Sequence, residues 1–334
     1  ALGRQARRAG DATLPVAIDR VRGRVAAAHW RLADPASPSV VQALGGVDVV
    51  IWIAADTDLE GALSLRPSAR RELVVKSAHT LVTACAAAGV SRLIVVTSAQ
   101  VYGAAPDNPL PLPEGFPLNG ARDAGIVGDL LAVEDVLADG RRVHPGLAIT
   151  VVRPAALVGP AVDTIVTRHF EAPRLLTVKG ATPAWQFCHV DDLVSALTVL
   201  RLRDLGSALT VGSPGWLTQE QVERLTGMRR VQLSETAALG TAQRLHQFGV
   251  LPAPASELAL ALHPWAVDSA TLRAAGWAAA YDNETCLGVL LETIKGRRAV
   301  AGRRVERKDA ALGAASAAVA LVGTAALLRR ARRR

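Results

Sequence analysis

The sequence predicts an α/β protein built on a doubly wound parallel sheet. Three observations support this fold class. Short apolar runs alternate with helical patterns through the first 154 residues. The run VDVVIWIAA at 47–55 is continuous, which is typical of a strand buried on both faces. The runs at 47–55 and 92–97 are too short and too rich in β-branched residues for an all-helical fold. Alternation at this spacing favours right-handed βαβ units.

The elements follow in a regular order. Ser37 and Gly46 mark the two ends of one predicted helix, and Gly89 closes another, because hydroxyl caps begin helices and glycine ends them. Strands are expected at 14–19, 24–30, 47–55, 91–98, 147–154 and 207–212. Helices are expected at 37–46, 69–89 and 121–139, after the HVDD run at 189–192, and from Thr218 onward.

The pattern loosens after residue 154, where short mixed elements run to about residue 291. This change predicts a smaller C-terminal substrate lobe at the carboxyl edge of the sheet. We therefore divide the chain into a nucleotide-binding domain at 1–160 and a lobe at 161–295, interleaved with the sheet, followed by a basic linker at 296–309. Residues 310–328 are uncharged and precede a basic tail at 329–334. Nineteen such residues approach the length of a membrane span, so we expect a C-terminal hydrophobic helix, transmembrane or interfacial. An alanine-rich surface helix is the alternative.

Composition and charge narrow the class of protein. The chain has 334 residues, 50% of them hydrophobic, which is enough to bury a sizeable core. Its net charge of +8 is concentrated near the C-terminus, where five of the last six residues are arginine. A basic tail without a basic, aromatic-rich face argues against nucleic-acid binding. The cysteines, Cys85, Cys188 and Cys286, are far apart in apolar contexts, so we expect small buried thiols and no metal site.

Four motifs occur in a characteristic order: GGVDVVIWIAA, AAAGVSRLIVVTSAQVYG, VVRPAALVGP and FCHVDDLVSAL. In this order and spacing they resemble the extended short-chain dehydrogenase/reductase family, in its NAD-dependent epimerase/dehydratase branch. The resemblance covers residues 11–290. It implies a Rossmann-type domain that holds NAD or NADP, a C-terminal lobe that holds a small-molecule substrate, and a homodimer formed through the helices at 69–89 and 121–139.

The resemblance also implies cofactor contacts. The family's glycine-rich loop meets the pyrophosphate between the first strand and first helix. No such loop is visible, and residues 1–10 resemble that first helix, so we expect the strand and loop to precede Ala1. Asp19 is expected to bind the ribose hydroxyls, which slightly favours NAD, whereas Arg20 keeps NADP open. Ala54, Ala55 and Thr97 are expected to lie along the dinucleotide.

For catalysis, the family combines a serine with a Tyr-x-x-x-Lys pair. Ser98 matches the serine, although capping of the strand end is the alternative. The helix at 121–139 contains neither tyrosine nor lysine. Alignment on Glu134 places Gly125 or Ile126 at the tyrosine position and Asp129 or Leu130 at the lysine position. Asp123 and Asp129 are the carboxylates nearest to these positions in the sequence.

The substrate contacts implied by the resemblance are Tyr102, Trp185 and Arg153. Tyr102 belongs to the serine motif and is not the family's catalytic tyrosine. Trp185 or Gln186 stands where nucleotide-sugar epimerases carry an arginine, and a tryptophan offers apolar area in place of charge. The HVDD run is expected to begin a helix, with its carboxylates satisfying the free N–H groups of the helix start.

These observations leave three hypotheses. The first is an atypical NAD(P)-dependent epimerase/dehydratase-like oxidoreductase for a nucleotide-sugar or a similar small hydroxyl or keto substrate. The second is a non-catalytic dinucleotide-binding module anchored at the membrane. The third is a membrane-associated lipid- or sterol-type dehydrogenase. A cytoplasmic domain, membrane-associated through its C-terminal segment, is expected in each case.

Overall fold

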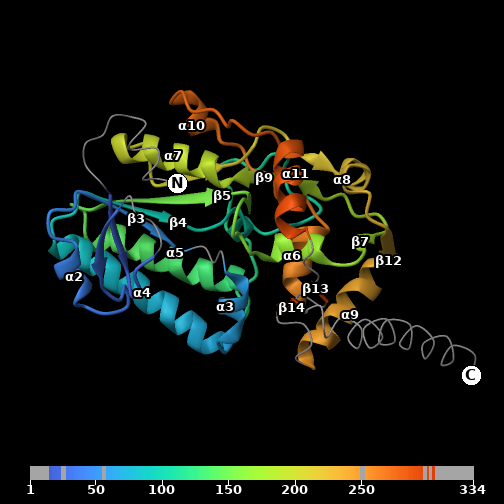
Figure 1. Ribbon diagram of the computed structural model, residues 1–334, viewed down its shortest axis with the longest axis horizontal. Helices are drawn as coiled ribbons and strands as arrows, with labels where there is room; N and C mark the ends of the chain where they lie inside the picture. Colours follow the sequence, from blue (N-terminus) through green and yellow to red (C-terminus); the bar gives the residue numbers. More distant parts are fainter. Residues whose placement is uncertain are drawn as a thin grey trace, which may run out of the picture.

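The centre of the molecule is a four-stranded parallel sheet in the order β10-β5-β4-β3. The computed structural model describes residues 15–23, 28–54, 58–248, 253–295, 299–300 and 303–304. In Figure 1, α4 and α5 lie on one side of this sheet and α7 lies on the other. Helices therefore cover both faces, which confirms the doubly wound α/β fold. The expected helix at 310–328 lies outside the described residues.

The strands and helices follow the chain order expected from the sequence, with additional short elements in the lobe. The strands are β1 (Val16–Asp19), β2 (His29–Leu32), β3 (Val49–Ile53), β4 (Arg92–Val96), β5 (Ala148–Pro154), β6 (Ala156–Val158), β7 (Leu175–Val178), β8 (Ala184–Trp185), β9 (Phe187–His189), β10 (Ala208–Val211), β11 (Leu217–Thr218), β12 (Arg230–Leu233), β13 (Ala299–Val300) and β14 (Arg303–Arg304). The helices are α2 (Val40–Ala43), α3 (Leu59–Ser64), α4 (Pro67–Ala87), η1 (Ala99–Tyr102), α5 (Ile126–Val143), α6 (Ile165–Glu171), α7 (Val190–Leu202), α8 (Gln219–Thr226), α9 (Glu235–Gln247), η2 (Ala255–Ala261), α10 (Ala270–Ala274) and α11 (Asn283–Ile294).

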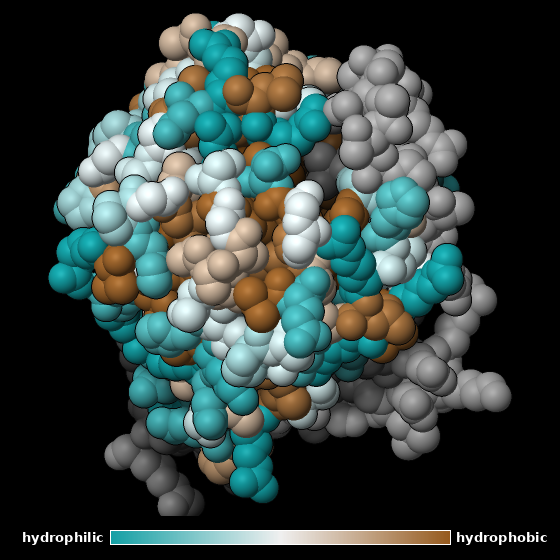
Figure 2. Space-filling view, turned by 90° about the vertical axis from the view of Figure 1, so that its left-hand side faces the viewer, coloured by the Kyte–Doolittle hydropathy of each residue, from teal (hydrophilic) through white to brown (hydrophobic). Residues whose placement is uncertain are grey.

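Strand β3 differs from the prediction of a strand buried on both faces. Its residues are half-buried, and Ile53 is 46% exposed. Strands β1 and β2 pair in parallel but form a separate two-stranded sheet. Residues of β1 and β3 line a gap of about 120 Å³, which explains why β3 is less buried than β4. Figure 2 shows this end of the molecule, where brown hydrophobic residues reach the surface between hydrophilic ones.

Two predicted helices have different boundaries in the structure. The helix predicted at 37–46 is only α2, because Ser37 and Ser39 hydrogen-bond each other and form turns before Val40. The helix predicted at 121–139 begins at Ile126 and continues to Val143. By contrast, α4 ends where expected, and Gly89 follows it with a φ of +71°.

The lobe is built from short paired strands and helices that lie on the right in Figure 1. Strand β7 pairs with β12, β8 with β11, and β6 with β9. The chain nevertheless returns to the central sheet, because β10 pairs with β5. The second half of the chain thus completes the sheet as well as forming the lobe. Among the described helices, none combines the length and hydrophobicity that a membrane span requires.

A buried ion pair joins α4 to α5. The Asp129 carboxylate accepts hydrogen bonds from Arg70 Nε at 2.5 Å and from Arg71 Nε at 2.8 Å. Arg70 also donates to the Ala124 carbonyl, just before α5. Arg70 and Asp129 are both buried, so neither charge has water as an alternative partner.

We expect Asp129→Ala to lower the free energy of unfolding by about 3–5 kcal/mol, because it leaves Arg70 buried without its carboxylate. Urea unfolding followed by circular dichroism measures this loss. Asp135→Ala is the matched control, since its ion pair with Arg122 is exposed; it should cost less than about 1 kcal/mol. Equal losses in the two variants would show that the buried pair is not a main support of the α4–α5 contact.

Candidate functional site

Ser98 lies at the carboxyl end of β4, the edge at which parallel α/β sheets bind ligands. Its Oγ accepts a hydrogen bond from Gln100 N at 3.2 Å and so caps η1. Ser98 also lines a crevice together with Thr97, Gln100 and the start of β6. The capping role and the site role are therefore compatible. Because Oγ acts as an acceptor toward Gln100, its own proton can be donated to a ligand.

Two aliphatic side chains of α5 face the same crevice. Ile126 and Leu130, one helical turn apart, line it with Ser98. Ile126 and Leu130 form one of the two residue pairs that the sequence offers for the tyrosine and lysine positions. The other pair is excluded from the crevice lining: Asp129 is bonded to the arginines of α4, and Gly125 has no side chain. Hydrocarbon side chains can neither donate nor accept a proton, so the described residues that line this crevice include no tyrosine–lysine pair of the kind that the resemblance implies.

The carboxylates nearest in sequence to the missing pair are bonded elsewhere. Asp123 accepts hydrogen bonds from Gly125 N and from the Ser256 hydroxyl. Asp129 holds Arg70 and Arg71. Neither residue lines the Ser98 crevice.

The crevice itself is small. Its volume is about 40 Å³, and each water molecule needs roughly 10–15 Å³ by this measure, so it holds about three. A nicotinamide ring is larger than this space. By this measure the crevice on its own does not enclose a nicotinamide ring, and we derive no hydride step from it.

A buried network lies beside Ser98. Glu134 of α5 forms an ion pair with Arg153 of β5 at 2.6 Å, and its Oε1 accepts a hydrogen bond from Thr97 Oγ1 at 2.8 Å. Arg153 also donates to the Tyr102 hydroxyl at 2.9 Å, and that hydroxyl donates to the Glu114 carbonyl. Burial is the main reason that the pKa of Tyr102 is raised above its usual value. The network joins α5, β5, η1 and the end of β4.

The expected substrate contacts are thus separated in the structure. Tyr102 and Arg153 are buried and bonded to each other, and neither lines the Ser98 crevice or the lobe pocket described below. Their assignment as substrate contacts stays a prediction, and the geometry instead gives them a part in the buried network. Trp185 does line the lobe pocket. Gln186, the other residue considered at that position, is bonded to Ser213 and Val267 in the interior.

The residues expected at the dinucleotide's adenosine end lie at the surface or near it. Asp19 ends β1 and is exposed; its Oδ1 accepts a hydrogen bond from Arg20 N at 2.6 Å. Its second oxygen has no partner among the described residues, so it fits a ribose hydroxyl. Ala54 follows β3 and donates its N–H to the Val96 carbonyl. Ala55 lies outside the described residues, as do residues 1–14, where the first helix is expected.

The HVDD run begins α7 as expected, but its carboxylates do not behave alike. His189 is the N-cap and accepts a hydrogen bond from Asp191 N through Nδ1. Asp192 is buried and accepts hydrogen bonds from the backbone N–H groups of Ala280 and Tyr281. It therefore joins α7 to the loop before α11, and the expectation that it caps its own helix is wrong.

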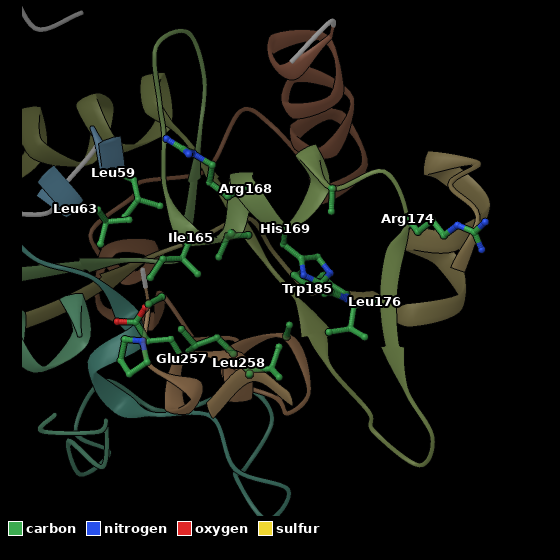
Figure 3. A pocket seen from close by; sticks show the side chains of 17 residues that line it. Leu59, Leu63, Ile165, Arg168, His169, Arg174, Leu176, Trp185, Glu257 and Leu258 are labelled. Atoms are coloured by element: carbon green, nitrogen blue, oxygen red, sulfur yellow. The ribbon is translucent and has the colours of Figure 1, made fainter. Parts of the chain in front are cut away.

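A larger pocket of about 240 Å³ lies in the lobe, between α3, α6, β7, β8 and η2. In Figure 3, the side chains of Leu59, Ile165 and Glu257 lie on one side of it, and the rings of His169 and Trp185 lie together on the other. Leu59 and Ile165 line this pocket and also the Ser98 crevice, so the two spaces adjoin. The lining is predominantly apolar.

Two buried polar atoms in this lobe pocket have no hydrogen-bond partner, Glu257 Oε2 and His169 Nε2. Glu257 Oε1 accepts hydrogen bonds from Ile126 N at 2.7 Å and Val127 N at 3.5 Å. Burial raises the pKa of Glu257 to about 7, and the same backbone hydrogen bonds partly offset this rise. Burial lowers the pKa of His169 to about 4, so its imidazole is neutral at pH 7.

The cations at the pocket are turned to other partners or to the outside. Arg168 is bonded to Asp163 at 2.6 Å and to Glu60 at 2.8 Å. Arg174 is exposed, and Figure 3 shows its side chain extending away from the His169 and Trp185 rings. The polar groups directed at the interior are thus a carboxyl and a neutral imidazole.

Sequence reasoning missed Glu257 and His169. Glu257 is 131 residues away from the helix that it caps, and no local motif marks either residue. The only sequence signal is a glutamate beside apolar residues in SELALAL, which also describes an ordinary amphipathic turn.

The fold closely matches several solved structures. MoeE5 in complex with UDP-glucuronic acid and NAD has a TM-score of 0.62 and 22% identity, covering 88% of this chain and 94% of that one. The NAD-dependent NDP-hexosamine 5,6-dehydratase TunA has a TM-score of 0.63 and 20% identity, covering 89% and 93%. The UDP-glucose 4-epimerase of Thermotoga maritima, with UDP-glucose, has a TM-score of 0.64 and 15% identity, covering 88% and 94%.

Relatives by sequence carry no assigned activity. Proteins described as uncharacterized from Mycobacterium tuberculosis and Mycobacterium bovis are 31% identical over 208 residues, covering 61% of this chain and 54% of theirs. The chain thus spans about half the length of these relatives. A Sinorhizobium fredii protein, also described as uncharacterized, is 28% identical over 165 residues, covering 47% and 39%.

The family described as NAD(P)H-binding matches residues 17–174, which include most of β1, all of β2 to β6, Ser98 and the whole of α5. Together with the structural neighbours, this match confirms the resemblance predicted from the sequence motifs. Residues 17–174 thus match the family described as NAD(P)H-binding, in a chain with the fold of the solved NAD-dependent dehydratase and UDP-glucose 4-epimerase structures.

Proposed function

We propose that this chain is a dinucleotide-binding module that also holds a small molecule in its lobe pocket and works by binding both. The observation that carries this proposal is the pair Ile126 and Leu130, which face Ser98 where a proton relay would be needed. Removal of a general acid–base group typically costs 10²–10⁴-fold in rate. The 40 Å³ volume of the crevice supports the same conclusion.

The dinucleotide part of the proposal is supported by the NAD(P)H-binding match and by Asp19. A carboxylate at the end of β1 can accept hydrogen bonds from both ribose hydroxyls of NAD and would repel the 2′-phosphate of NADP. We therefore propose NAD as the preferred dinucleotide. Anchoring of the module by residues 310–328 stays a prediction, because these residues lie outside the described part of the chain.

A second candidate function is an atypical epimerase/dehydratase-like oxidoreductase for a small hydroxyl or keto substrate. One observation favours it: the Ser98 hydroxyl proton can be donated, and its crevice adjoins the lobe pocket at Leu59 and Ile165. A substrate in that pocket would therefore have a path to Ser98. This candidate requires an acid or base other than the missing tyrosine.

A nucleotide-sugar is the substrate class that the structural neighbours suggest, since MoeE5 and the epimerase were solved with such compounds. The lobe pocket offers little for a diphosphate. Arg168 is engaged by two carboxylates, and Arg174 lies at the exposed edge. A diphosphate taken out of water without a facing cation is strongly disfavoured.

We expect Asp19→Ala to weaken NAD⁺ binding roughly 10- to 100-fold, because a hydrogen bond to a charged group contributes about 1.5–3 kcal/mol. The loss for NADP⁺ should be smaller, since removing the carboxylate also removes its repulsion of the 2′-phosphate. Isothermal titration calorimetry with both dinucleotides measures this. Asp107→Ala, an exposed aspartate on a distant loop, serves as the control. An unchanged ratio of the two affinities in Asp19→Ala would reject the ribose assignment.

Turnover separates the two candidate functions. With NAD⁺ or NADH and a panel of hydroxyl and keto compounds that includes UDP-glucose, we expect no interconversion of the dinucleotide above background. Ser98→Ala should bind NAD⁺ as the wild type does. A turnover that disappears in folded Ser98→Ala would establish the oxidoreductase instead, and one that survives this substitution would exclude Ser98 from the chemistry.

A further inference from the structure

The lobe pocket contains a polar group whose second oxygen is not used by the fold. Glu257 is 4% exposed, and its Oε1 caps α5 while its Oε2 has no partner. A buried polar atom without a hydrogen bond is disfavoured by roughly 1–3 kcal/mol. Native structures rarely keep such an atom unless it serves a ligand, an ion or an ordered water molecule.

His169 provides a second point of the same kind. It lies on α6, its ring is 5.2 Å from the ring of Trp185, and its Nε2 is buried without a partner. Figure 3 shows His169 across the pocket from Glu257. Leucine, isoleucine and alanine side chains form most of the wall between them. The pocket thus presents two polar points in an apolar surround, the usual composition of a small-molecule site.

We infer that this pocket binds an uncharged, mainly apolar carbonyl compound, whose oxygen accepts a hydrogen bond from the protonated Glu257 carboxyl group. This inference rests on the proposed function, which states that the lobe pocket holds a small molecule, and it names the class of that molecule. Its test needs no dinucleotide. A failure of dinucleotide binding would therefore leave it standing, and its own failure would leave the NAD(P)H-binding domain unaffected.

The charges around Glu257 explain the preference for an uncharged ligand. Asp123 is the nearest carboxylate and opposes ionisation of Glu257, whereas Arg70 favours it. Arg168 on α6 is held by Asp163 and Glu60. Oε1 already accepts two backbone N–H groups, so the proton of the neutral form resides on Oε2, which has no other partner among the described residues. A ligand carboxylate or phosphate would lose its hydration and, among the described lining residues, would find a cation outside an ion pair only in Arg174 at the exposed edge.

The pocket volume limits the size of the ligand. An apolar cavity of about 150 Å³ holds benzene, so about 240 Å³ accommodates roughly ten non-hydrogen atoms. The ketone 2-nonanone has this size, one carbonyl oxygen and no titratable group. It is therefore a suitable probe, with nonanoate as a charged compound of similar length and UDP-glucose as the nucleotide-sugar.

We expect the affinity of the full chain for 2-nonanone, measured by calorimetry, to fall about tenfold between pH 6 and pH 8. The fraction of protonated Glu257 falls by this factor around a pKa of about 7. Nonanoate and UDP-glucose should bind at least tenfold more weakly than the ketone at pH 6. No binding of 2-nonanone, an affinity independent of pH, or tighter binding of either anion would overturn the inference.

Variants identify the group responsible. Glu257→Gln keeps an acceptor for Ile126 N and places a permanent donor in the pocket, so it should bind 2-nonanone at both pH values with equal affinity. Glu72→Gln, an exposed glutamate of α4, should retain the tenfold change. Persistence of the pH dependence in Glu257→Gln would exclude Glu257 as its source.

A blocking variant keeps the test decisive if Glu257→Gln does not fold. Ala172→Phe adds a ring at the pocket wall, at the end of α6, and leaves Glu257 and His169 themselves unsubstituted. Folded Ala172→Phe, verified by its thermal unfolding transition, should bind 2-nonanone at least tenfold more weakly. Unchanged affinity in this variant would place the ketone elsewhere and refute the assignment to this pocket.

Discussion

The buried ion pair between Glu134 and Arg153 is the interaction on which the arrangement around Ser98 depends. It joins the middle of α5 to β5, and its remaining hydrogen bonds reach Thr97 at the end of β4 and Tyr102 in η1. Ser98 lies between Thr97 and η1, so both of its neighbours along the chain are held by this pair. Two buried charges are tolerated only when their hydrogen-bonding capacity is satisfied, and here Thr97 and Tyr102 satisfy it.

The same helix determines what Ser98 faces. The ion pair between Glu134 and Arg153 fixes the rotation of α5 about its axis. Asp129 therefore contacts the arginines of α4, and Ile126 and Leu130 line the crevice. A serine that faces hydrocarbon side chains at the expected tyrosine and lysine positions can bind through its hydroxyl group, yet those two positions offer no route for proton transfer. The fold alone therefore does not establish an activity, and the residues of α5 decide the question.

Most of the central fold could be predicted from local patterns, because strands β4 and β5 are rich in apolar, β-branched residues and a glycine follows the end of α4. The position of Ser98 followed from its motif. What could not be predicted depends on contacts distant in sequence. The start of α5 is fixed by Glu257, and the half-buried state of β3 reflects the gap to β1. The burial of Arg153 with Glu134 was equally invisible, since an arginine at a strand end also suits a phosphate.

Glu257 connects the two spaces of the candidate site. Its Oε1 holds the N–H of Ile126, whose side chain lines the Ser98 crevice, while Glu257 also lines the lobe pocket and its buried Oε2 has no partner among the described residues. The ionised carboxylate is the stronger acceptor for the N–H groups of a helix start and is favoured by the helix dipole. The neutral form is the one that burial favours and that can donate to a ligand. Protonation of Glu257 thus weakens its hydrogen bonds to the start of α5 and supplies a donor for a ligand. A ligand that binds the neutral form therefore stabilises the state in which the start of α5, which forms a wall of the crevice, is capped more weakly.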